Sequence, residues 1–402
     1  MTKEKKIIIS ISSLVCFLDV FYELFFNIYI LQKVTTNIPY IFCCYMIGVI
    51  IAIILYYPFY KILNGKTATL IYRLSFILSF ILIILSMTIN SGFAFALIFI
   101  NSLKYVRSMF FHIPQEIATI QFVDKKESDG FLAIKVIFNT VTKVGFSLIV
   151  SSLFAYVNTI VLFVLMLAIV VIMFILSFGM KSIGADFVFR PKGYLNDCKK
   201  YPHMKYIYLA HAFKRMSEAG VVATLIPIML FLKLDSEFSI GIYSTIAYVV
   251  TIFILPLFVK LKKSKSPTLY ASLSTLIISS ILLVLFPNKI TYILYYFINQ
   301  IASAIYTNKE NADLFNSIKF PILIENKEEH TYFYGLYGLV SEIISYVIGI
   351  TFYYLIPLTY SIPIIIILFM TSKLVSLMLL QKANSLIETQ KLKIIETTQT
   401  NQ

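Results

Sequence analysis

Long apolar runs recur along the whole chain and constrain its fold more than any motif does. A helix needs about 20 apolar residues to cross the hydrocarbon core of a bilayer. Twelve such segments can be read, at residues 7–31, 38–60, 70–88, 93–123, 131–157, 159–180, 207–232, 238–261, 269–286, 290–318, 332–356 and 360–380. The runs are continuous and lack the roughly 10-residue alternating pattern of barrel strands. With 59% hydrophobic residues and a mean hydropathy of +0.85, the sequence predicts an all-α membrane protein with twelve transmembrane helices.

Basic residues fall in alternate loops of this topology. The two termini and the loops on their side hold 23 Lys and Arg residues, whereas the opposite loops hold three, Lys33, Lys233 and Lys289. Because loops rich in Lys and Arg stay in the cytoplasm, both termini are expected to be cytoplasmic, in a multi-pass protein of the cell (plasma) membrane. The net charge of +14 then describes a positive cytoplasmic face that can attract membrane lipids, and no nucleic acid is needed to explain it.

The longest hydrophilic connection divides six predicted helices from six. It predicts an N-terminal half (1–180), a cytoplasmic linker (181–205), a C-terminal half (206–381) and a polar cytoplasmic tail (382–402). A shift of 201 residues lays DKKESDGFLAIKVIF, from Asp124, over ENKEEHTYFYGLYGL, from Glu325, and also superimposes the basic loops after the second and eighth helices. Two alignments at one offset indicate that the halves are parallel repeats.

This organisation resembles the major facilitator superfamily of secondary transporters over nearly the whole chain. In the loop PFYKILNGKT after the second helix, Gly65 and Lys66 match the gating motif of the family, although Ile62 stands where the family has an acidic residue. In the fourth helix, Arg107 matches the arginine that family members use in proton coupling. The stretch ending at Gly145 looks most like the drug and macrolide efflux branch, but the proline of the antiporter motif is missing.

Charged residues inside the predicted helices mark the candidate site. A charge at that depth costs at least a few kcal/mol unless it faces water or a partner. In the first helix, Asp19 and Glu23 are four residues apart and share a face. Two close carboxylates cannot both ionise cheaply at low dielectric, so one of them is expected to exchange protons. Equally open is that they form structural ion pairs with bases of the fourth or fifth helix.

The fourth and fifth helices carry those bases. Lys104 and Arg107 share one face of the fourth helix. The family resemblance implies that helices 1, 4, 7 and 10 line a central cavity, so both cations are expected to meet the first-helix carboxylates or to bind an anionic group of the substrate. Glu116, nearer the cytoplasm, is predicted to act in gating. Lys143 lies deep in the fifth helix and needs a partner; it is a predicted substrate-binding residue.

The C-terminal half carries a second set of candidates. In the seventh helix, Arg215 and Glu218 are predicted to bind substrate, with pairing between the two as the alternative. In the eleventh helix, Glu342 is alone at mid-depth and is a second candidate for proton coupling.

The tenth helix contributes Asn299 and Gln300 as predicted substrate-binding residues. Further along, the sequence NKEN at 308–311 is polar on all sides. A lipid-packed helix does not tolerate that pattern, so the helix is expected to leave the bilayer or to break there. A place in the cavity and a place at the cytoplasmic surface are both open.

No enzyme signature is found: the chain has neither a phosphate-binding glycine loop nor a His-Glu-x-x-His pair. No metal site and no cofactor are expected, so energy would come from an ion gradient. The sequence predicts a monomeric proton-coupled antiporter that exports a small molecule (a drug, peptide or amino acid derivative) by alternating access. Two alternatives stand: an uptake permease, or a non-transporting membrane scaffold or immunity protein with a transporter-like fold.

Overall fold

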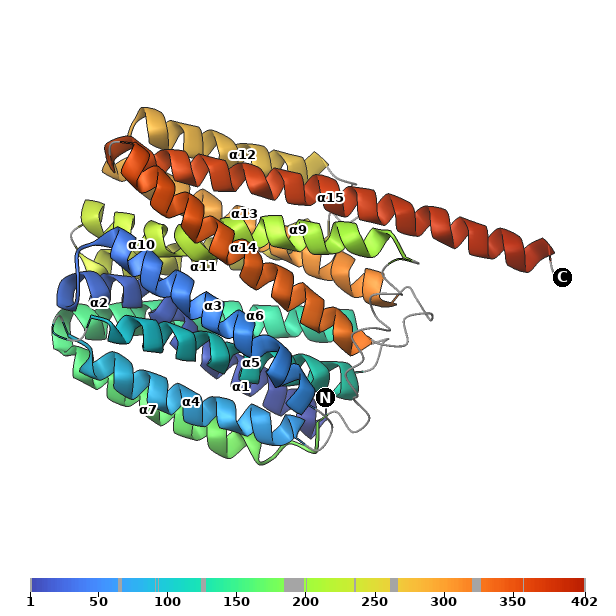
Figure 1. Ribbon diagram of the computed structural model, residues 1–402, viewed down its shortest axis with the longest axis horizontal. Coiled ribbons are helices and arrows are strands. Elements are labelled where there is room, and N and C mark those ends of the chain that lie inside the picture. The colour runs from blue at the N-terminus through green and yellow to red at the C-terminus, as the bar shows by residue number, and fades with distance from the viewer. Residues whose placement is uncertain are drawn as a thin grey trace.

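The chain forms one bundle of long helices that lie side by side (Figure 1). The computed structural model describes residues 2–63, 67–90, 92, 94–123, 128–183, 199, 201–234, 236–260, 267–319, 327–356 and 358–400. Within these residues the structure is helical and contains no strand. This agrees with the all-α class that the sequence predicts.

The helices follow the chain in this order. The first half contains α1 (Lys3–Val20), the π-helix η1 (Phe21–Phe25), α2 (Phe26–Lys33), α3 (Ile38–Ile62), α4 (Ala68–Thr88), α5 (Ala96–Phe122), α6 (Ser128–Ser152), the π-helix η3 (Leu153–Val157) and α7 (Thr159–Ser177). The second half contains α9 (His203–Glu218), α10 (Gly220–Leu234), α11 (Glu237–Lys260), α12 (Pro267–Leu285), α13 (Lys289–Lys319), α14 (Lys327–Leu355) and α15 (Leu358–Thr400).

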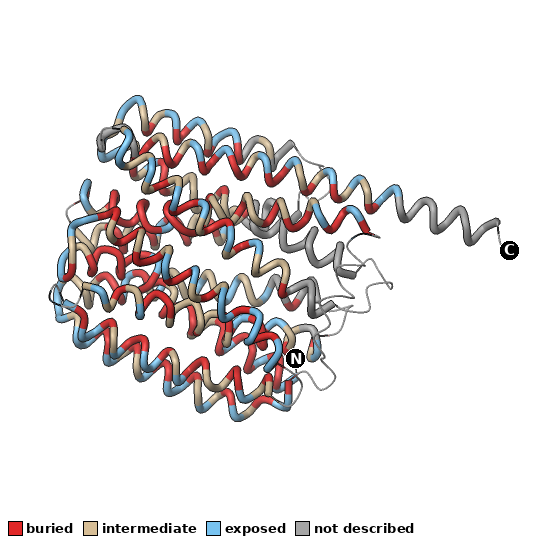
Figure 2. Tube along the Cα trace, viewed as in Figure 1, coloured by how far each residue is buried: buried red, intermediate tan, exposed pale blue. Residues whose placement is uncertain are grey.

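Nine stretches of helix in the described part of the chain are long and apolar enough to cross a membrane. Large apolar side chains, such as Ile54, Phe99 and Ile175, stay exposed on the outside of the bundle, while buried residues face its interior (Figure 2). A lipid environment accounts for exposed surface of this kind, which water would penalise. The protein is therefore a multi-pass membrane protein. The helices α5, α12 and α13 lie in the same bundle outside those nine stretches, and the full count of twelve crossings stays a prediction.

Short polar caps set where the apolar helices begin. Asn37 precedes α3, and its side-chain oxygen accepts a hydrogen bond from the backbone N–H of Tyr40 at 3.1 Å. Asn158 caps α7 in the same way, through the N–H of Ile160 at 2.8 Å. The first N–H groups of a helix have no partner within the helix, so an Asn in front of each apolar run satisfies one of them and fixes the turn.

The seventh predicted helix is broken, whereas the sequence predicts it to be continuous over 207–232. The helix α9 ends at Glu218, and α10 begins at Gly220, whose φ is +60°. This left-handed conformation favours glycine because it has no Cβ. The N–H of Val221 donates to the Oγ of Ser345 in α14 at 3.2 Å, which satisfies a backbone donor that the break releases.

Two further helices also differ from the prediction. The helix α13 runs without interruption through 308–311 to Lys319, so of the two predicted alternatives the break is absent, and exit from the bilayer stays a prediction. The helix α15 continues past residue 380 through most of the polar tail and ends at Thr400. In both segments the polar residues interrupt the apolar pattern without stopping the helix.

The two halves of the chain meet along pairs of helices. In one pair α3 packs on α14, where Tyr346 contacts Phe42 and Tyr45 near one end and Tyr332 contacts Tyr56 near the other. In a second pair α6 packs on α11, and at the end opposite the chain termini α2 and η1 pack on α10 (Figure 1).

Helix α11 approaches α6 very closely at Gly241. A Cβ added there would lie 1.9 Å from the Oγ of Ser151 and 2.9 Å from the carbonyl oxygen of Ser147. In a bilayer the hydrophobic effect does not drive helices together, so they associate largely through close van der Waals packing. A small residue such as Gly241 allows the two backbones to approach closely enough for that packing.

Candidate functional site

Charged side chains from the middle of the helices form two groups. The first, called here the N-half charges, consists of Asp19, Glu23, Lys104, Arg107 and Lys143. The second, called here the C-half network, consists of Lys214, Arg215, Glu218, Glu342 and Lys373. Each group has three cations and two carboxylates, so each carries one more positive than negative charge.

Among the N-half charges, Glu23 and Lys143 form an ion pair with the Nζ 3.4 Å from the Oε2. Glu23 lies in the π-helical turn η1, and its side chain is 55% exposed. The ammonium of Lys143 also lies 5.9 Å from the ring centre of Tyr248, which belongs to α11 in the other half. Lys143 thus has the partner that its depth requires, and Glu23 makes the ion pair with a base of the fifth predicted helix that the sequence left open.

Arg107 points toward α4. Its Nε donates to the Oγ of Ser79 at 2.9 Å, and its guanidinium lies 5.3 Å from the ring centre of Phe111. Its Nη2 is buried and has no hydrogen-bond partner among the described residues. The expected direct pairing of Arg107 with Asp19 or Glu23 is absent from the described part of the chain, where neither carboxylate lies within 4.0 Å of the guanidinium.

Asp19 and Lys104 are half-buried, and within the described part of the chain neither makes an ion pair or a side-chain hydrogen bond. They are nevertheless close to the other charges. Asp19 lies within electrostatic range of Glu23, Arg107 and Lys143, and Lys104 lies within range of Glu23 and Glu342. The interior between the halves therefore holds opposite charges that face one another across more than ion-pair distance.

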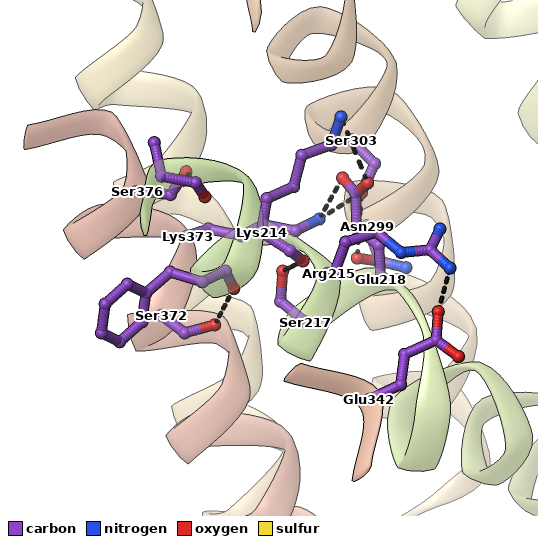
Figure 3. A network of polar contacts seen from close by, with 12 residues as sticks. Lys214, Arg215, Ser217, Glu218, Asn299, Ser303, Glu342, Ser372, Lys373 and Ser376 are labelled. Carbon is purple, nitrogen blue, oxygen red and sulfur yellow. Dashed lines mark hydrogen bonds and ion pairs between the residues drawn. The ribbon is translucent and has the colours of Figure 1, made fainter. Parts of the chain in front are cut away.

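In the C-half network, one carboxylate is held by two lysines (Figure 3). Glu218 lies 3.7 Å from the Nζ of Lys214 and 3.3 Å from the Nζ of Lys373. The side chain of Lys373 is 0% exposed, and its ammonium also donates to the Oγ of Ser303 at 2.5 Å. Ser303 in turn donates to the predicted substrate-binding residue Asn299 at 3.4 Å, within α13. Lys373 of α15 thus links α13, through Ser303, to α9, through Glu218.

Glu342 is the second centre of the C-half network. It forms an ion pair with Arg215 and accepts a hydrogen bond from the hydroxyl of Tyr105 at 2.5 Å. Two expectations are corrected here: Glu342 is not alone at mid-depth, and Arg215 pairs with Glu342 rather than with Glu218. Because Tyr105 belongs to α5 and Glu342 to α14, this hydrogen bond crosses from one half of the chain to the other.

The helix break lies beside this network. Glu218 is the last residue of α9, and a Cβ on Gly220 would come 2.7 Å from the Oγ of Ser345, one turn from Glu342 along α14. Interrupted helices at membrane depth occur where the backbone is buried in protein or lines a cavity, and transporters place binding sites at such points. The break therefore marks the same region as the buried charges.

The remaining predicted site residues lie as follows. Gln300 is next to Tyr296, whose hydroxyl is 2.7 Å from the Oγ of Ser244. Glu116 is exposed and makes no ion pair with any described residue. The predicted gating residues Gly65 and Lys66, and the side chains of 308–311, lie outside the described part of the structure.

The sequence analysis missed Lys373 of the C-half network and Tyr105, which donates a hydrogen bond to Glu342 of that network. Lys373 interrupts the apolar run 360–380, and this is the same signal that identified Lys104. Tyr105 carried no such signal, because it is one of 28 tyrosines and nothing in the sequence says which hydroxyl meets a carboxylate.

Comparison with known proteins gives matches among solved structures. No family model and no curated protein sequence matches the chain. A bacterial metal transporter matches at 13% identity and a TM-score of 0.60, over 96% of this chain and 99% of its own. A bacterial homologue of the human lysosomal transporter Spinster, in an inward-facing and unoccupied conformation, matches at 11% identity and 0.62, over 96% and 97%. The nucleoside transporter NupG matches at 13% identity and 0.61, over 96% and 99%.

These likenesses span nearly the whole length of both chains and show a shared fold. The three proteins are transporters, in agreement with the class of fold that the sequence resembles. None is described as a drug or macrolide exporter, so placement in that branch stays a prediction. At 11–13% identity the likeness assigns no role to a single residue.

Proposed function

We propose that this protein is a secondary transporter of the major facilitator type, which moves a small molecule by alternating access and uses protons as the coupling ion. The observation that carries the proposal is the meeting of ionisable side chains from both halves, at mid-helix, on a fold shared with solved transporters. Tyr105 and Glu342 represent this arrangement, since their hydrogen bond joins α5 to α14. A contact of this kind breaks and re-forms when the halves rock against each other.

The packing of the halves supports alternating access. The helices α2 and α10 are in contact at the end of the bundle that lies away from the termini (Figure 1). The distribution of basic residues among the loops supports cytoplasmic termini. In that orientation this contact between the halves lies at the outer side of the membrane.

Asp19 is the proposed proton carrier. Glu23 is held by Lys143, and Glu342 is held by Arg215 and Tyr105, so these two carboxylates act as fixed countercharges. Asp19 has no ion pair among the described residues, and it lies within electrostatic range of Arg107. Arginine stays charged throughout, so protonation of Asp19 changes the charge that faces Arg107 and can shift the balance between conformations.

Export is the proposed direction, and the proposed cargo is a drug, a peptide or an amino acid derivative. The protein would work as a monomer in the plasma membrane. The experiment uses purified protein in vesicles that contain a pH-sensitive dye. A panel of drugs, peptides and amino acids is added to wild type, to Asp19→Asn and to the control Glu23→Gln, which neutralises the neighbouring carboxylate. Proton movement and movement of the compound are both recorded.

Substrate-dependent proton flux is expected in the wild type. In Asp19→Asn, exchange of labelled for unlabelled compound should persist while proton flux disappears; in Glu23→Gln, some proton flux should remain. Normal gradient-driven transport by Asp19→Asn would show that another group carries the proton. Folded wild-type protein that moves no compound would favour the non-transporting scaffold.

A further inference from the structure

The charges between the halves do not cancel, and the cations that have no carboxylate at ion-pair distance in the described part of the chain belong to the N-half charges. In the C-half network every cation has a carboxylate within ion-pair distance, because Glu218 serves both lysines. Among the N-half charges, only Lys143 has such a carboxylate in the described part of the chain. Lys104 and Arg107 remain, with Asp19 as the one carboxylate that is not already in an ion pair.

Lys104 is the more accessible of these two cations. The exposure of Arg107 is 7%, and its guanidinium is engaged with Ser79 and Phe111 on the side of α4. Lys104 is half-buried, and its neighbour Tyr105 reaches across to Glu342 in the opposite half. Lys104 also lies within electrostatic range of Glu342 itself, so it is near the second half at the level where polar contacts join the two halves.

A net positive charge in a low-dielectric interior is costly unless an anion balances it. Glu23 and Glu342 lie within range of Lys104, but each already compensates another cation. One further anionic group would bring the N-half charges to neutrality. A transported ligand is a source of that group that enters and leaves with each cycle.

We infer that the ligand carries an anionic group, a carboxylate or a phosphate, and that the ammonium of Lys104 binds it. The inference rests on the proposed transport function, since it names the substrate class of the same site. It places the anionic part of the ligand against α5, between the Lys143–Glu23 pair and the Arg215–Glu342 pair. A ligand that also carries an amine can direct it to Asp19, so zwitterions fit the site as well.

The test is a binding measurement without a gradient, on the purified full chain in lipid nanodiscs. The probes are cyclohexanecarboxylate with its neutral amide, and cyclohexyl phosphate with cyclohexanol, so that each anion has a matched neutral compound. In the wild type, at least one anion is expected to bind about tenfold or more tightly than its neutral match, because hydrogen bonds to charged groups are the stronger ones. The two pairs separate a carboxylate site from a phosphate site.

Three variants test whether Lys104 causes the preference for the anion over its neutral match. Lys104→Gln should reduce it to about twofold or less, whereas Lys104→Arg, which keeps the charge, should retain it. Lys33→Gln makes the same change at an exposed lysine and should leave it unaltered. A further measurement uses only wild-type protein, so it does not depend on whether the variants fold. Lysine amines are acetylated and the modified residues are identified by mass spectrometry. The anion should slow acetylation of Lys104 and leave that of Lys33 unchanged.

Equal affinities for anion and neutral match in the wild type, including no binding at all, would overturn the inference. So would an anion preference that survives Lys104→Gln, or acetylation of Lys104 that the anion does not slow. The two proposals can fail separately. Anion binding without transport of any compound would remove the transport function and leave the site, whereas transport restricted to neutral or cationic compounds would remove the anion site and leave the transport function.

Discussion

The two charged groups have the same balance of charges but opposite states of pairing. In the C-half network each charge has a partner at contact distance, and Lys373 is completely enclosed. Among the N-half charges, one exposed ion pair forms, and Asp19 and Lys104 face the interior without one among the described residues. Buried charges that are fully paired fix a structure, whereas charges without a fixed partner can bind a proton or a ligand. Under the proposed function, the second half provides a rigid frame and the first half the charges that exchange protons or ligand.

The largest effect is expected from Glu218→Gln. The substitution leaves the enclosed ammonium of Lys373 without its carboxylate, and breaking a buried pair in this way costs about 3–5 kcal/mol. The melting temperature in nanodiscs should fall accordingly. The double variant Glu218→Gln, Lys373→Met removes both charges and should recover most of the loss. A single variant as stable as the wild type would mean that the C-half network is not the rigid part.

An intermediate effect is expected from Tyr105→Phe. The substitution removes the hydroxyl that donates to Glu342 across the two halves, and a hydrogen bond to a charged group contributes about 1.5–3 kcal/mol. Tyr22→Phe is the matched control, because its hydroxyl contacts the Oγ of Ser86 at 3.2 Å within one half and is neutral; about 0.5–1.5 kcal/mol is expected there. Thermal unfolding measures both. Equal losses of unfolding free energy in the two variants would show that the hydrogen bond between the halves stabilises the protein no more than one within a half.

The smallest effect on stability is expected from Glu23→Gln. The carboxylate is 55% exposed, and exposed ion pairs contribute at most about 1 kcal/mol. The same chemical change at Glu218 should cost several times more, which makes the two variants a direct comparison of the groups by thermal unfolding. If the two substitutions lower the unfolding free energy equally, the C-half network is no more rigidly paired than the N-half charges.

The sequence predicted the elements better than it predicted the contacts. The thickness of a bilayer fixes the length of an apolar helix, so the positions of most helices follow from hydropathy. The depth of Lys143 implied a partner on another helix, and Glu23 is that partner. Which acid meets which base depends on how each helix is rotated about its axis. For that reason the sequence offered Glu218, three residues away on the same helix, as the partner of Arg215, and not Glu342 on α14.

The helix break shows a second limit of the sequence. Gly220 is one of 13 glycines, and its neighbours are apolar residues typical of a continuous helix. Its positive φ accompanies a contact with Ser345 on a helix more than a hundred residues away, including the bond from the N–H of Val221. The helix propensity of glycine gives only the local free-energy cost of placing it in a helix. The interruption depends on packing against another helix, which exists only in the folded protein.

The break at Gly220 also decides which parts of the chain can move together. The helix α9 packs on α15 and α14, while α10 packs on α11, α13, α14 and α15 of its own half and also on α2 and η1 of the other half. No continuous hydrogen-bond ladder makes the two segments one stiff rod. The break therefore puts a hinge in the middle of one transmembrane segment, beside Glu218: α10 touches both halves, and α9 with its charges can tilt relative to it.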